Sequence, residues 1–205
     1  MPSAGSRAID RTALLGAFLR LHMATLTDER LAGLPLAEQT ELNSSMDTLG
    51  DIARTYGLSR PAARIYQSAL VIDERRVRLD PGNTEYRRDL SVSYNKLGDL
   101  ARAEGRTAEA RDLYQRYQDV ARELTALDPG NTGYRRDLSV SYSKLGDLAA
   151  AEGRTTEARD LYQQGLDIAR ELTELDPGNT DYLSDLSWFR QRLAEVAATQ
   201  GRDQQ

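Results

Sequence analysis

The five residues D-P-G-N-T occupy positions 80–84, and the same string returns at 128–132 and at 176–180. The copies are 48 residues apart, and residues 81–128 match residues 129–176 at 39 of 48 positions. Adjacent proline and glycine disfavour helix and favour a turn. The string therefore predicts a corner that recurs once per structural unit, and the near-identity of the two copies indicates duplication of that unit.

Between two corners, the sequence predicts two helices. Apolar residues recur at spacings of three and four from Tyr86 to Ala101 and again from Ala110 to Leu127, which is the pattern of one helix face. Gly105 lies between the two runs and suits the left-handed conformation that ends a helix. No run shows the alternation of a strand, so the fold class predicted is all-α.

The starts of these helices carry residues that commonly serve as caps. We expect Asn83 or Thr84 to cap the first helix of the second unit, because both side chains can accept a backbone N–H. By the same argument Thr107 is expected to cap the second helix, and Ser59 and Thr155 the equivalent helices of the neighbouring units.

When the 48-residue spacing is continued in both directions, Gly50 aligns with Gly98 and Gly146, and Tyr66 aligns with Tyr114 and Tyr162. A further helix is expected over residues 9–31, which makes about eight helices in all. We predict a single solenoid domain in five parts: an N-terminal extension with one helix, a half-repeat or cap (1–32), repeats over 33–80, 81–128 and 129–176, and a C-terminal half-repeat or capping helix (177–205).

Several spaced residues of each unit resemble the tetratricopeptide signature W-x2-L-G-x2-Y…A-x3-F…P. In the second unit these residues are Tyr94, Leu97, Gly98, Ala101, Ala110 and Tyr114. The resemblance implies a right-handed α-solenoid of antiparallel helix pairs. The usual period of the family is about 34 residues, so each helix here is about seven residues longer and keeps the same face inward. The sequence is thus identified as a long-helix variant with a 48-residue period.

Composition excludes several classes of function. The chain has no cysteine, so disulfides and thiolate chemistry are absent. A net charge of -5 argues against nucleic-acid or anionic-membrane surfaces, which need clustered positive charge. No apolar run approaches the roughly 20 residues of a membrane helix, so we expect a cytoplasmic protein. The near-absence of lysine among the basic residues is typical of a GC-rich bacterial genome.

No arrangement of residues indicates catalysis, a metal or a cofactor. The single histidine, His22, has no metal-spaced carboxylates beside it, and no phosphate-binding, nucleophile-elbow or zinc-protease motif occurs. The D-P-G-N-T corners lack the alternating carboxylates of a calcium loop. We therefore predict that the chain is not an enzyme and binds no cofactor.

In tetratricopeptide proteins the first helix of each pair lines a concave groove, and the resemblance implies which residues do so here. They are Asp47, Asp51, Arg54, Asn95, Lys96, Asp99, Arg102, Ser143, Lys144, Asp147, Gln191 and Glu195. Asp51, Asp99, Asp147 and Glu195 form an acidic column, one per repeat. One hypothesis is that the column recognises a basic or amide-rich peptide. The other is that it pairs with Lys96, Lys144 and neighbouring arginines.

A second charged feature is a basic ladder at the start of two first helices, made of Arg87, Arg88, Arg135 and Arg136. Such a ladder could bind an acidic partner or phosphates, although Glu85, Asp89 and Asp137 dilute its charge.

The function predicted is that of a protein–protein interaction scaffold or adaptor that holds a peptide or partner protein in its groove. A regulatory or sensor module that acts with a separate ATPase, protease or transcription regulator is the first alternative. Head-to-tail self-association, in which the N-terminal helix of one copy completes the C-terminal half-repeat of another, is the second.

Overall fold

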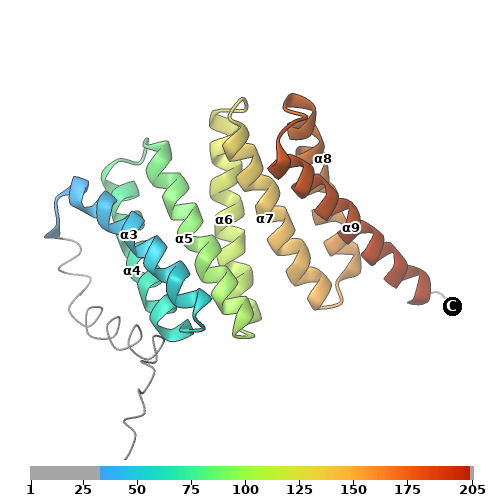
Figure 1. Ribbon diagram of the computed structural model, residues 1–205, viewed down its shortest axis with the longest axis horizontal. Coiled ribbons are helices and arrows are strands. Elements are labelled where there is room, and N and C mark those ends of the chain that lie inside the picture. The colour runs from blue at the N-terminus through green and yellow to red at the C-terminus, as the bar shows by residue number, and fades with distance from the viewer. Residues whose placement is uncertain (1–32, 204–205) are drawn as a thin grey trace, which may run out of the picture. The chain divides into compact units, whose positions relative to one another are not determined.

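The computed structural model describes residues 33–203, and the predicted helix over residues 9–31 and His22 lie outside them. The described residues form seven α-helices and no strand, so the all-α prediction is confirmed for this part of the chain (Figure 1). The helices are α3 (Leu36–Thr55), α4 (Ser59–Leu79), α5 (Thr84–Ala103), α6 (Thr107–Leu127), α7 (Thr132–Ala151), α8 (Thr155–Leu175) and α9 (Thr180–Asp203).

These helices belong to two compact units that divide between Pro81 and Gly82. The first unit holds the pair α3 and α4. In the second unit α5 packs on α6, α6 on α7, α7 on α8 and α8 on α9, which is the stacking in chain order of an α-solenoid. Within the described residues, no helix combines the length and apolar character that a membrane span needs.

The turn inside each pair depends on a glycine with positive φ. Gly57, Gly105 and Gly153 have φ of 70°, 73° and 73°, a region that side chains with a Cβ rarely adopt. Each follows the last turn of a first helix, as predicted for Gly105. The corners between pairs end in an asparagine that caps the next helix. Asn131 is such a cap, and its side chain accepts the backbone N–H of Tyr134 at 3.1 Å.

The predicted caps of the second helices are wrong. Thr107 is the first residue of α6, and the residue at the cap position is Arg106, which makes no side-chain capping bond. Thr107 Oγ1 instead donates to the carbonyl of Gly105 at 3.4 Å. Ser59 and Thr155 likewise begin α4 and α8. The tight glycine turn places each hydroxyl one residue too late to accept from the helix N–H groups.

A tyrosine ring pressed against a glycine joins the two helices of each pair. A Cβ built on Gly98 would lie 2.6 Å from Cε1 of Tyr114, and one on Gly146 would lie 2.5 Å from Cε1 of Tyr162. Both rings are almost wholly buried, at 0% and 1% exposure. The first unit repeats the contact between Gly50 and Tyr66. The absence of a side chain on the first helix is what admits the ring.

We predict that Gly98→Ala destabilises the protein by about 1–3 kcal/mol, because the new methyl overlaps the Tyr114 ring and forces it to shift. Alanine normally favours a helix over glycine, so the sign reports the contact. The measurement is urea unfolding. Gly133→Ala is the control, since Gly133 holds the repeat position of Glu85 and a side chain is tolerated there. Equal behaviour of the two variants would contradict the packing argument.

The contact between α8 and α9 also packs an aromatic ring on a glycine, but here the second helix of the pair carries the glycine and the following first helix carries the ring. The ring of Phe189 on α9 lies against Gly165 on α8, where a Cβ would approach Phe189 Cζ to 2.2 Å. One repeat earlier, the position of Gly165 holds Tyr117 and that of Phe189 holds Ser141. Trp188 adds edge-on contacts to Phe189 at 5.0 Å and to Tyr162. Trp188 and Phe189 thus cover the interface between α8 and α9.

The first unit contains a buried polar cluster that the second unit lacks. Asp73 and Arg76 of α4 are 0% and 2% exposed, and their side chains are 3.1 Å apart. Asn43 of α3 donates a hydrogen bond of 2.9 Å to Asp73. At the same repeat positions the second unit has alanine, leucine and serine: Ser91, Ala121 and Leu124, and Ser139, Ala169 and Leu172.

Removing Asp73 takes a carboxylate away from the buried guanidinium of Arg76, whereas replacing the three side chains together with uncharged ones need not be costly. We predict that Asp73→Ala lowers the free energy of unfolding by about 3–5 kcal/mol. The triple variant Asn43→Ser, Asp73→Ala, Arg76→Leu, which copies the other repeats, should recover most of that loss in urea unfolding. A triple variant less stable than the single one would show that the network itself stabilises the unit.

Candidate partner-binding groove

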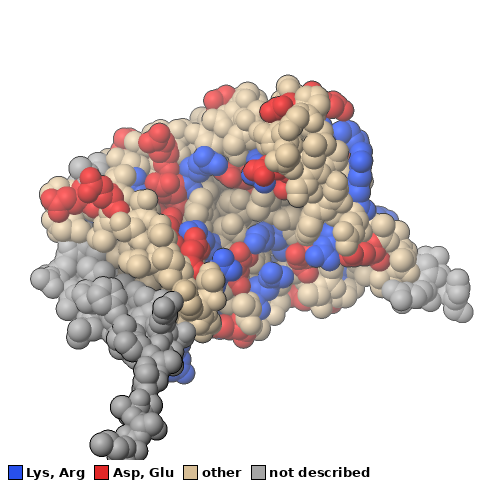
Figure 2. Space-filling view, in the orientation of Figure 1, with Lys and Arg blue, Asp and Glu red and all other residues tan. Residues whose placement is uncertain are grey.

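The groove residues predicted from the sequence lie on the first helix of each pair. In the first unit these are Asp47, Asp51 and Arg54 on α3. In the second unit they are Asn95, Lys96, Asp99 and Arg102 on α5, Ser143, Lys144 and Asp147 on α7, and Gln191 and Glu195 on α9. Acidic and basic side chains alternate over the face shown in Figure 2, so neither sign of charge dominates it.

The aspartates of the acidic column accept hydrogen bonds from the tyrosines that pack on the glycines. The hydroxyl of Tyr114 donates to Asp99 Oδ1 at 2.7 Å, and that of Tyr162 donates to Asp147 Oδ1 at 2.8 Å. Tyr66 and Asp51 make the same bond in the first unit, at 2.7 Å. Each tyrosine therefore reaches from the glycine crossing to the surface of the first helix.

A cation from the next first helix completes the arrangement in the second unit. Lys144 Nζ lies 2.6 and 2.8 Å from the two carboxylate oxygens of Asp99. Arg192 Nε lies 3.6 Å from Asp147 Oδ1, a looser contact. Sequence analysis missed Arg192, although it holds the repeat position of Lys96 and Lys144. Tyrosine, aspartate and cation thus form a triad, which occurs twice in the second unit.

Burial, followed by the neighbouring aspartate, raises the pKa of Tyr66, Tyr114 and Tyr162 far above the ordinary tyrosine value. The folded state therefore keeps phenolic protons that the unfolded chain releases as the pH rises through 10.

We predict that ionisation of these tyrosines has no effect on the free energy of unfolding below pH 10. Above pH 10 the free energy of unfolding falls as the pH rises, because only the unfolded state then loses these protons. Alkaline titration followed by phenolate absorbance should show part of the ten tyrosines ionising only as the chain unfolds. Tyr56→Phe, which removes a tyrosine that is 54% exposed, is the comparison variant. Ionisation of all ten before unfolding would contradict the prediction.

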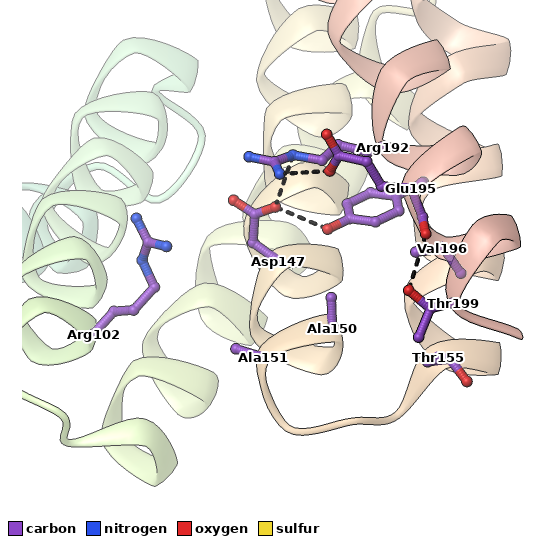
Figure 3. Close-up of a pocket in the computed structure, with 10 residues that line it drawn as sticks. Arg102, Asp147, Ala150, Ala151, Thr155, Arg192, Glu195, Val196 and Thr199 are labelled. Carbon is purple, nitrogen blue, oxygen red and sulfur yellow. Dashed lines mark hydrogen bonds and ion pairs between the residues drawn. The ribbon is translucent and has the colours of Figure 1, made fainter. Parts of the chain in front are cut away.

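A pocket of about 360 Å³ opens between α7 and α9, and we call it the charged pocket. Its lining residues are Arg102, Asp147, Ala150, Ala151, Thr155, Tyr162, Arg192, Glu195, Val196 and Thr199. Figure 3 shows Asp147, Arg192 and Glu195 joined by ion pairs on one side, while Arg102 of α5 stands apart from them. The hydroxyl of Tyr162 donates to Asp147 on that side. Three predicted groove residues, Arg102, Asp147 and Glu195, therefore meet here.

The charges of this pocket are unequally matched. Arg192 pairs with Glu195 at 2.9 Å as well as with Asp147, and hydrogen bonds from Gln191 and Arg192 lower the pKa of Glu195. Arg102 makes no ion pair with any carboxylate in residues 33–203. One guanidinium at the pocket thus has no carboxylate partner among the described residues.

A second, smaller pocket of about 180 Å³ lies further along α7 and α9, and we call it the tryptophan pocket. It is lined by Ser139, Val140, Ser143, Asp185, Trp188 and Phe189. The guanidinium of Arg192 lies over the Trp188 ring, 5.0 Å from its centre, and stands between the two pockets. We refer to both pockets together as the α7–α9 cleft.

Every arginine of the basic ladder pairs with a carboxylate. Arg88 Nε lies 2.7 Å from Asp137, and Arg136 Nε lies 2.7 Å from Asp185. Arg87 and Arg135 pair with Glu123 and Glu171, respectively. The hydrogen bond from the carboxylate raises the pKa of Arg88. The ladder therefore joins neighbouring helices and has no guanidinium without a carboxylate partner, which weakens the hypothesis that it binds an anionic partner.

No protein-family model and no curated protein matches the chain. Solved structures that resemble it include the Sgt2 TPR domain from Aspergillus fumigatus, with a TM-score of 0.41 and 17% identity over 82% of this chain and 85% of that one. BtubC (BKLC) from P. vanneervenii has a TM-score of 0.45 and 18% identity over 93% and 85%.

The de novo designed helical repeat protein DHR64 has a TM-score of 0.37 and 13% identity over 92% of this chain and 94% of that one. The seven described helices, stacked in chain order within the second unit, make the chain a helical-repeat protein.

Proposed function

We propose that this protein is a non-enzymatic interaction scaffold that holds a segment of a partner protein on the face formed by α5, α7 and α9. The observation that carries the proposal is the α7–α9 cleft, where two pockets lie in line on the first helices. Concave, partly apolar surfaces with a few polar groups are the usual sites of binding. The described residues hold no group of three or more histidines and carboxylates placed to bind a metal.

The contacts of the acidic column favour one of the two hypotheses about its role. Both oxygens of Asp99 are taken by Lys144 and Tyr114. A basic peptide would have to displace Lys144 to reach this carboxylate. This supports the hypothesis that the acidic column pairs internally, and leaves a basic or amide-rich partner with weaker support at Asp99.

We also propose that the repeats run over 33–80, 81–128 and 129–176, with 177–205 as a half-repeat, in a long-helix variant of the tetratricopeptide repeat. The helix starts support these boundaries, since α3, α5, α7 and α9 begin at Leu36, Thr84, Thr132 and Thr180. The shared contact of tyrosine and glycine in each pair supports the family resemblance.

Of the alternatives, head-to-tail self-association has an observation against it. Ala194 on α9 holds the repeat position of Gly98 and Gly146, and its side chain is exposed. A tyrosine or phenylalanine of a second copy could not approach Ala194 as Tyr162 approaches Gly146, because the Cβ would overlap the ring. A regulatory module that acts with a separate enzyme remains compatible with the same binding face.

Two pairs of variants test the scaffold proposal in pull-downs from the native host. Ser143→Arg with Gln191→Arg adds two bulky charges to the first helices. Gln115→Arg with Gln163→Arg adds the same charges to exposed sites on α6 and α8. We predict that the first pair reduces recovery of bound proteins by at least about tenfold, as loss of a central contact does, and that the second pair leaves recovery unchanged.

Circular dichroism should show that both pairs keep the helical content of the wild type. Equal recovery with both pairs, or loss only with the pair on α6 and α8, would contradict binding on the first-helix face.

A further inference from the structure

The two near-identical repeats differ at nine positions, the 48 compared less the 39 that match. Three of the nine put a smaller residue beside the α7–α9 cleft. Ser143 replaces Asn95 and lines the tryptophan pocket, and Ala150 replaces Arg102 and lines the charged pocket. Gly165 replaces Tyr117 and admits the ring of Phe189. These three differences thus reduce side-chain volume at the α7–α9 cleft, on a surface that otherwise repeats.

The replacement at Ala150 changes the charged pocket. It removes an arginine side chain from α7, which leaves room in front of Tyr162. Arg102 of α5 lines the same pocket and has no carboxylate partner in the described residues. Lys144 and Arg192, which hold one repeat position on α7 and α9, both have carboxylate partners.

The unpaired guanidinium decides which charge the pocket accepts. An incoming carboxylate gains a charge-assisted contact with Arg102 and displaces no carboxylate of the protein from it. An incoming cation meets only Asp147 and Glu195, which already pair with Arg192. The pocket therefore favours an acidic group over a basic one.

The tryptophan pocket offers a different contact. Trp188 and Phe189 present ring surface, and Val140 adds a methyl pair, so an apolar side chain fits there. Along α9 the pocket centres are about nine residues apart, or about 13 Å at the helical rise. An extended chain covers that distance in about four residues.

We propose that the α7–α9 cleft binds an extended protein segment with an acidic side chain in the charged pocket, against Arg102, and an apolar side chain in the tryptophan pocket about four residues away. The proposal rests on the scaffold function and names the chemistry of the partner. An internal Asp or Glu satisfies it, and no free C-terminus is required.

The probe is a phage-displayed library of random dodecamers selected on the whole chain. Enriched sequences are then synthesised with amidated C-termini. Trp188 is the only tryptophan of the chain and lines the tryptophan pocket, so its fluorescence reports binding at the cleft directly. We expect enriched peptides to carry Asp or Glu three to five residues from an apolar residue, and to change the fluorescence saturably.

Two variants and a matched control test the role of each contact. Arg102→Gln should weaken binding of these peptides by at least about tenfold, as should replacing the acidic residue of the peptide by its amide. Ala150→Arg, which restores the residue of the preceding repeat, should abolish binding by filling the charged pocket. Arg54→Gln alters the same repeat position on α3, and should change binding by less than about twofold.

The outcomes separate the two proposals. Enriched peptides without an acidic residue, or peptides that bind Ala150→Arg as well as the wild type, would overturn the cleft assignment and leave the scaffold function standing. A library that yields no binder at all, together with unchanged recovery of host proteins by the groove variants, would overturn both.

Discussion

The close approach of a tyrosine ring to a helix that has no side chain at the crossing is the constraint on which each pair depends. At Gly50, Gly98 and Gly146 the ring occupies the space where a Cβ would be. Because the ring fills that space, the two helices lie close enough to bury the alanines beside it, such as Ala101 and Ala110, which are 0% exposed. The same tyrosine carries its hydroxyl to an aspartate on the first helix. One residue type therefore sets both the packing inside the pair and the position of a charge on its surface.

That second effect changes how the charged face is interpreted. Aspartates in a column would ordinarily indicate a surface for basic ligands, yet Asp99 is bound by Tyr114 and by Lys144 from the next first helix. Arg88 and Arg136 connect α5 to α7 and α7 to α9 in the same manner. Partly exposed ion pairs of this kind contribute little stability individually. Their regular spacing is better explained by fixing the orientation of successive helices, which leaves recognition to the few groups that have no partner.

Much of the fold could be predicted from the sequence because its signals are local and repeated. The helix pairs and the glycine turns both follow from residues spaced along one segment. The caps at Thr107 and its equivalents could not, since the geometry of the turn at Gly105 decides which residue begins the helix. Less of the candidate site could be predicted from the sequence. Arg192 is recognisable by its repeat position. The lack of a carboxylate partner at Arg102 depends on Lys144 and Tyr114 binding Asp99, and these three residues lie on three helices that only the folded chain brings together.

Two repeat positions exchange a large and a small residue: Tyr117 and Ser141 become Gly165 and Phe189 in the next repeat. This exchange affects which helices can pack on one another during folding. Repeats of nearly the same sequence can dock on the wrong neighbour during folding, and such misassembly is a known hazard of tandem arrays. If α9 docked on α6 in place of α8, Phe189 would meet Tyr117 where it requires a glycine. The clash makes the out-of-order product unfavourable. A single pair of matched residues thereby distinguishes two otherwise interchangeable segments.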